Sequence, residues 1–282
     1  MSPSISTRTL DHIVHMTSPG SVEETAEQFR KLGFNVLPGG RHADGLTENA
    51  LIVLQDGVYL ELISFVLPFS SYPRDSPERQ KRAGHRWAKM PNGWIDYAFL
   101  GNGSKEEGSR ISDIINNRAR ADGSHDLYSS EHEGGRERPD GKVLKWLISS
   151  SLQKKHGILP FFCGDVTDRT LRVPVEPPSN LEHPCSAVGI AHVHVTCSSS
   201  DVDTLVKEFT YVIGDAPKKS NASRFEWELD TSTPSRPSHL IVDAADIGSS
   251  GLSISELGIY VERVPDEDST TTPFGRIFWV KA

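Results

Sequence analysis

The chain has 282 residues, a length typical of one large domain or two ordinary ones. Hydrophobic residues make up 36% and charged residues 24%, which excludes the disordered class because this much apolar material can form a core. With a net charge of −8 the chain gains little from releasing counterions on nucleic acid, so nucleic acid is excluded from the expected partners.

A strand, a helix and three strands are predicted first along the chain, at residues 10–16, 22–32, 34–37, 48–55 and 58–66. The helix has apolar residues at helical spacing and stops at Gly33. The tripeptide PGG at 38–40 is expected to break the second strand, and Asp56-Gly57 is a hairpin turn signal. This order is a βαβββ module.

A second copy of the same order is predicted at residues 94–100, 105–121, 135–138, 142–150 and 161–166. The stretch from Pro68 to about Gly93, rich in Pro, Ser and Arg, separates the two copies. A connection of that length without a regular pattern indicates either a functional loop or a crossover.

A third copy begins at AHVHVTCS (191–198), which repeats the strand DHIVHMTS of the first copy. Its helix is expected at 201–209 and its meander at 225–229, 238–244 and 257–264. The predicted organisation is a paired domain over 8–168, a Pro-rich linker over 169–184 and a third, partial module over 185–282. Because this copy lacks a partner copy, we expect it to pack on the outside of the pair or to pair across a homodimer.

Four segments of the first two copies, LDHIVHMT, PGGRHADGLTENALIVL, GVYLELISF and GWIDYAF, resemble the glyoxalase-like branch of the vicinal oxygen chelate superfamily. The resemblance covers roughly residues 9–165 and implies an α+β fold in which tandem βαβββ modules pair into a curved, partly closed barrel-like cleft. It also implies a divalent metal held by His12 and Glu61, with Asp96 as the ligand from the second module. The fourth ligand position, near 161–165, holds no residue type that squarely fits it.

The strand pattern agrees with this placement of His12 and Glu61. His12 alternates with apolar residues on one strand, and Glu61 shares a face with Tyr59 and Ile63 on another. An imidazole and a carboxylate that face inward need a partner, which a divalent metal supplies. A metal-free site is the alternative, in which His12 and Glu61 form a hydrogen-bonded acid–base pair.

Further candidates lie near this pair. Glu48 stands where relatives show Thr-His-Asn and this chain has Thr-Glu-Asn, so it either replaces a ligand or proton-transfer group or marks a lost role. Arginine binds carboxylates and enolates in a bidentate manner. The candidate substrate-binding residues are His42, Arg136, Arg138, Tyr59 and Trp146. His192 and His194 repeat the His12 strand but lack a matching glutamate, which favours a structural role.

These features predict an enzyme that acts on a small oxygenated organic substrate by metal-assisted or acid–base, enolate-stabilising chemistry, as a lyase or isomerase. The first alternative is a metal-free protein that binds a small molecule. The second is an extradiol-type dioxygenase, which requires two His and one carboxylate on one cleft. Three cysteines without a CxxC pair, no secretory signal and no membrane-length apolar run predict a cytoplasmic protein with no membrane partner.

Overall fold

The computed structural model describes residues 5–138, 140–153, 157–219, 221, 223–233, 236–245, 253–272 and 275–282. The first module comprises β1 (Thr9–Thr17), α1 (Val22–Lys31), β2 (Leu37–Arg41), β3 (Thr47–Val53) and β4 (Tyr59–Phe65). The second comprises β5 (Gly93–Leu100), α3 (Ile111–Ala121), β6 (His132–Glu137), β7 (Val143–Ser149) and β8 (Phe161–Asp165). Both modules have the predicted element order.

The two modules share one curved sheet because their first strands, β1 and β5, pair antiparallel. Within each module the first strand pairs parallel with the last, which gives the strand order β2-β3-β4-β1-β5-β8-β7-β6. The outer strands β2 and β6 approach each other at an isolated bridge between His42 and Arg136. The sheet is therefore strongly curved without closing into a barrel, which confirms the predicted fold class.

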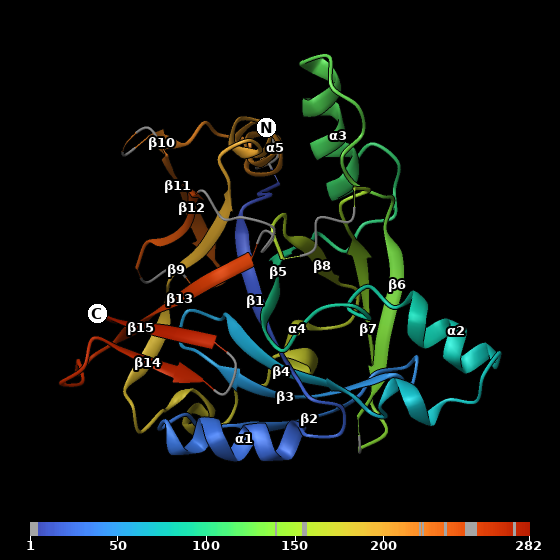
Figure 1. Ribbon diagram of the computed structural model, residues 1–282, viewed down its shortest axis with the longest axis vertical. Coiled ribbons are helices and arrows are strands. Elements are labelled where there is room, and N and C mark those ends of the chain that lie inside the picture. Colours follow the sequence, from blue (N-terminus) through green and yellow to red (C-terminus); the bar gives the residue numbers. More distant parts are fainter. Residues whose placement is uncertain are drawn as a thin grey trace.

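The third module consists of β9 (Ala187–Ser198), α5 (Val202–Ile213), β10 (Lys218–Lys219), β11 (Arg224–Thr231) and β12 (Ser238–Ala245). Three more strands follow, β13 (Ser253–Val261), β14 (Ser269–Thr272) and β15 (Gly275–Lys281). The segment 257–264, predicted to close the meander, lies mainly in β13, which pairs antiparallel with β9 as β5 pairs with β1. This module therefore finds a pairing partner within its own chain, and β11 joins it to β1. In Figure 1, β1 runs through the middle of the molecule, with β13–β15 to one side and β6–β7 to the other.

The two faces of the first sheet bury different kinds of side chain because strand residues alternate. The face toward α1 is apolar, with Ala50, Ile52, Leu60 and Leu62 packed against Phe29. The concave face carries the polar residues Thr47, Asn49 and Glu61. The functional candidates thus gather on the concave face. No helix in the described part of the chain is long and apolar enough to cross a membrane.

Strand β2 corrects the prediction that PGG breaks a strand at 34–37. The strand instead runs over Leu37–Arg41, with a register shift between Pro38 and Gly40 opposite β3. A Cβ on Gly39 would lie 2.0 Å from Asn49 Oδ1, so glycine is needed for the close approach of the Asn49 side chain. This approach lets Asn49 Oδ1 accept a hydrogen bond from Gly40 N at 3.0 Å.

Two connecting segments pack on the concave side of the sheet. The long connection after β4 contains η1 (Phe69–Ser71) and α2 (Pro77–Gly84), and its residues 85–87 line the cleft. The predicted linker contains α4 (Arg169–Arg172) and η2 (Pro178–Leu181) and buries Val173 against Leu51, Val53 and Tyr59. Both segments therefore form walls of the site.

Candidate functional site

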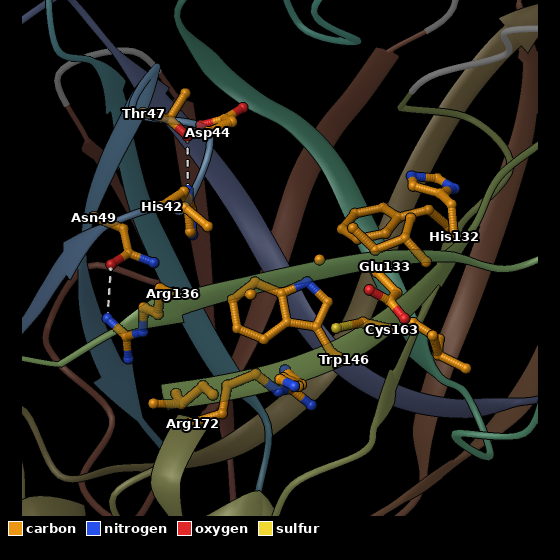
Figure 2. A pocket seen from close by; sticks show the side chains of 18 of the residues that line it. His42, Asp44, Thr47, Asn49, His132, Glu133, Arg136, Trp146, Cys163 and Arg172 are labelled. Carbon is orange, nitrogen blue, oxygen red and sulfur yellow. Dashed lines mark hydrogen bonds between the residues drawn. The ribbon is translucent and has the colours of Figure 1, made fainter. Parts of the chain in front are cut away.

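A cavity of about 870 Å³ opens on the concave face of the first two modules (Figure 2). Strands β1, β3 and β4 form one wall, β6 and β7 form another, and residues 85–87 cover part of it. Its predicted lining residues are His12, His42, Tyr59, Glu61, Arg136 and Trp146. Glu48, Asp96 and Arg138 are absent from the lining.

His12 is held by its neighbour Asp11. The pairing of β1 with β5 shifts register between Leu10 and His12, and at this bulge both Asp11 and His12 reach the same region. His12 Nδ1 lies 2.7 Å from Asp11 Oδ2, and the ring stacks on Tyr59 with centroids 4.7 Å apart. The Asp11 carboxylate contacts Nδ1, so Nε2 is the ring nitrogen that faces Glu61.

Glu61 lies at the centre of the site with 5% of its surface exposed. Its Oε1 accepts a hydrogen bond from Asn49 Nδ2 at 2.6 Å. His12 Nε2 is 3.8 Å from Oε2, and His42 Nε2 is 3.6 Å from Oε1. Strand alternation correctly predicted that His12 and Glu61 converge. Oε2 is the oxygen of Glu61 that Asn49 leaves available.

His42 completes this group from the loop after β2. Its Nδ1 lies 2.7 Å from Thr47 Oγ1, which turns Nε2 toward Glu61. Burial lowers the pKa of His42, and the nearby Glu61 carboxylate only partly offsets this. His42 is therefore a neutral imidazole at neutral pH.

A buried ion network lies behind Asp11. Arg172 donates to Asp11 Oδ2 and to the Tyr59 hydroxyl, each at 2.8 Å, and Arg169 also donates to Asp11. Burial raises the pKa of Asp11, but the guanidinium groups of Arg172 and Arg169 outweigh it and hold the pKa well below 3.8. Asp11 is thus a permanent carboxylate behind His12.

Asp96 does not face His12 as predicted. The antiparallel register pairs His12 with Ala98 and places Asp96 opposite Val14. The Asp96 side chain is fully buried, and Oδ2 accepts hydrogen bonds from Arg86 Nη2 and Trp87 Nε1, both at 2.8 Å. Asp96 therefore anchors the segment that covers the cleft.

The fourth ligand position of the second module is apolar. Phe161 and Cys163 of β8 face the cavity, and the Arg86 guanidinium lies 4.1 Å from the centroid of the Phe161 ring. Burial raises the pKa of Cys163 to about 12, so this thiol is not a nucleophile at neutral pH. The second module supplies walls to the cleft and no metal ligand at this position.

Besides Asp96, two predicted residues lie outside the cavity. Glu48 alternates with Thr47 and Asn49, which face the cleft, so its side chain is on the helix side of the sheet. Arg138 lies beyond the end of β6, where it pairs with Asp140 at 3.2 Å. Neither residue lines the cavity, where the sequence predicted a catalytic or substrate-binding role for it.

Several lining residues were not predicted. Asn49 belongs to the Thr-Glu-Asn motif, and strand alternation with Thr47 was the signal that could have identified it. Arg172 is the last residue of the short helix α4, and Arg86 and Trp87 belong to the irregular segment after α2. None of the three lies on a strand whose alternation could have indicated it.

The third module does not repeat the site. His192 Nε2 lies 3.3 Å from Glu256 Oε1, and His194 Nε2 lies 2.8 Å from Asp243 Oδ2. The register places Ile241 beside His194, the position that Glu61 holds beside Val14. Each histidine is thus tied to its own carboxylate.

The chain was compared with family models, curated proteins and solved structures. A family model described as "Glyoxalase-like domain" matches residues 10–212, well over half of the chain. No match was found among curated proteins. Among solved structures, a hypothetical protein from Staphylococcus aureus is 12% identical, with 97% of this chain and 99% of that chain covered and a TM-score of 0.68. This similarity shows a shared fold that includes the third module.

Two further structures match with lower scores. A mutant 4-hydroxymandelate synthase from Streptomyces coelicolor is 12% identical, with 91% of this chain and 72% of that chain covered and a TM-score of 0.47. A Mn(II)-bound glyoxalase from Novosphingobium aromaticivorans is 13% identical, with 91% and 66% covered and a TM-score of 0.45.

Proposed function

We propose that this chain is an enzyme that removes a proton next to a carbonyl group of an oxygenated organic substrate. The chain belongs to the glyoxalase-like domain family of the vicinal oxygen chelate superfamily. The observation that carries the proposal is the buried Glu61 carboxylate, whose two oxygens face His12 Nε2 and His42 Nε2. A buried carboxylate with an available oxygen, held between two oriented imidazoles, is suited to act as a general base.

In this proposal Glu61 Oε2 accepts the proton, because Asn49 already donates to Oε1. The C–H electron pair moves into the carbonyl, which becomes an enolate, and the proton returns to a neighbouring carbon or to the same one. Arg136, which lines the same cavity, stabilises the negative charge of the substrate. Isomerase and lyase reactions both begin with this step.

The family resemblance implies a divalent metal, and the donor types of His12, His42 and Glu61 suit one. Asp11 and Thr47 also contact the far nitrogen of each imidazole, as hydrogen-bonding groups behind metal-bound histidines do. The spacing fits less well, because ligands about 2.1 Å from one ion lie roughly 3.0–3.4 Å apart, whereas these separations are 3.6 and 3.8 Å. Within the described ranges no three His, Cys, Asp or Glu side chains are arranged to hold an ion. The proposed proton transfer is therefore assigned to the side chains alone.

Metal binding gives a separate prediction. We expect manganese(II) and zinc(II), titrated into the purified protein and followed by calorimetry, to bind weakly, and His12→Ala to leave that binding unchanged. A tight complex with one ion per chain that His12→Ala abolishes would instead establish the metal-assisted version. The same spacing argument applies to a dioxygenase, which needs two His and one carboxylate on one iron.

Proton transfer is tested by deuterium exchange. Hydroxyacetone, hydroxypyruvate and 2-hydroxyacetophenone each carry an acidic C–H next to a carbonyl, and exchange in D₂O is followed by ¹H NMR. We expect the wild type to catalyse exchange of at least one of these compounds. Glu61→Gln should reduce the rate at least about 100-fold, the lower range of a general base contribution.

Glu48→Gln is the matched control, since Glu48 lies between the cleft-facing residues Thr47 and Asn49 and points to the other side of the sheet. This variant should catalyse deuterium exchange of the test compounds at the wild-type rate. Equal rates for Glu61→Gln and wild type would contradict the assignment of the base. Failure of the wild type on all three compounds would favour a metal-free binding protein over the proposed enzyme.

A further inference from the structure

Three arginines line the cavity, and their charges are balanced differently. Arg172 pairs with Asp11 at 2.8 Å and with Asp165 at 2.7 Å. Arg86 pairs with Asp96 at 2.8 Å. Arg136 has no carboxylate of the described residues within ion-pair distance, although it lines the same cavity. Within the described part of the chain, Arg86 and Arg172 thus have carboxylate partners and Arg136 does not.

Arg136 is also deeply buried, with 6% of its surface exposed. Among the residues that the structure describes, its side chain makes one hydrogen bond, from Nη1 to Asn49 Oδ1 at 3.4 Å. Burial lowers the pKa of Arg136, and Glu61 and Tyr59 offset this only through space. A buried guanidinium costs free energy unless an anion pairs with it. A group that the cavity receives from outside would supply that anion.

Trp146 forms the flat wall beside Arg136 (Figure 2). A Cβ on Gly134 would lie 2.2 Å from Trp146 Nε1, so glycine at this position of β6 lets the indole lie against the strand. The indole N–H has no hydrogen-bond partner in the described part of the chain, and 8% of the residue is exposed. His42 and Phe161 add aromatic surface to the same cavity.

From these observations we infer that the substrate is a carboxylate joined to a flat aromatic body, with Arg136 binding the carboxylate and Trp146 contacting the ring. The cavity of about 870 Å³ is far larger than a three-carbon compound and lies in the range for drug-sized ligands. A guanidinium forms two parallel hydrogen bonds with a carboxylate, which matches its planar shape. The inference rests on the proposed function only for the identity of the reacting centre.

Binding is tested with three probes by calorimetry. Benzoylformate has the ring and the carboxylate, benzoylformamide keeps the ring without the charge, and pyruvate keeps the carboxylate without the ring. Benzoylformate has no C–H next to its ketone, so its binding is independent of the proton transfer assigned to Glu61. We expect benzoylformate to bind at least about tenfold more tightly than either of the other two probes. One charge-assisted hydrogen bond supplies a difference in affinity of this size.

Arg136→Met should remove the preference for benzoylformate over the amide, and Arg136→Lys should keep part of it because the charge remains. Arg138→Met is the matched control, since Arg138 lies outside the cavity and pairs with Asp140. It should keep the full preference. Equal affinity of the wild type for acid and amide, or equal losses in Arg136→Met and Arg138→Met, would overturn the inference.

Thermal unfolding of the ligand-free variants gives a second, independent readout. Arg136→Met should raise Tm, because it removes a buried charge that has no carboxylate partner among the described residues of the free protein. An arginine with a structural role would lower Tm on the same replacement. A lower Tm for Arg136→Met would therefore contradict the assignment of Arg136 to an external anion.

Discussion

Replacing Arg172 with methionine should lower the free energy of unfolding by about 3–5 kcal/mol, the usual cost of removing one partner from a buried ion pair. Arg172 is 5% exposed and bonds both Asp11 and Asp165, of which Asp11 is fully buried. Without this guanidinium, only Arg169 and His12 offset the free-energy cost of burying the ionised Asp11 carboxylate. Urea unfolding at pH 7, followed by circular dichroism, measures the loss.

Arg120→Met is the matched control, because Arg120 pairs with Asp126 at 2.7 Å on the surface, with side-chain exposures of 54% and 44%. Exposed pairs of this kind contribute little to stability, so Arg120→Met should change the free energy of unfolding far less than Arg172→Met does. The double variant Asp11→Asn with Arg172→Met should lose less free energy of unfolding than the two single variants lose together. Asp11→Asn removes the buried carboxylate charge that Arg172→Met would leave unpaired. A loss below about 1 kcal/mol in Arg172→Met would show that the network is not a stabilising element.

Local sequence patterns were enough to predict the module order and the central pair of the site. Strand periodicity placed His12 and Glu61 on inward faces, and the repeat of the His12 strand at His192 revealed the third module. These features depend on residues that are neighbours along one element. The same periodicity could have indicated Asn49, which shares the inward face with Thr47.

The remaining features depend on contacts between distant segments. Asp96 was predicted to be a ligand because it aligns with His12 along the strand, yet the irregular segment before β5 brings Arg86 and Trp87 onto its carboxylate. Asp11 was overlooked because strict alternation points it away from His12, and a register shift reverses that. No periodic pattern encodes either event.

The strand order of the third module also depends on contacts between distant segments. Its edge strand β10 is only Lys218–Lys219, too short to leave a pattern, so the meander was assigned one strand too far along the chain. The true position of β13, beside β9, depends on pairing between residues more than 55 positions apart, such as Gly258 with His192. Such pairing follows from covering the open edge of β9 and not from local propensity.

Acid should unfold the wild type more readily than a His15→Phe variant. His15 is fully buried on the helix side of β1, between the rings of Phe29 and Trp94. Burial lowers its pKa from 6.5 to about 3. The folded state therefore binds fewer protons than the unfolded state between these two values, and the stability that neutral His15 contributes is complete above pH 6.5 and lost as the pH falls toward 3.

The slope for one such group is about 1.4 kcal/mol per pH unit. The Phe variant loses the contact between His15 Nε2 and Thr272 Oγ1 at 2.9 Å, which lowers its stability at pH 7 by about 1 kcal/mol. The order should reverse near pH 6, where the wild type has lost about 1 kcal/mol through this group, and by pH 4.5 the loss should reach about 2–3 kcal/mol. The urea midpoints of the wild type and of His15→Phe, plotted against pH from pH 4 to pH 8, should therefore give two curves that cross. His125→Phe, at an exposed position, should follow the wild-type curve; parallel curves for wild type and His15→Phe would assign the acid sensitivity to other groups.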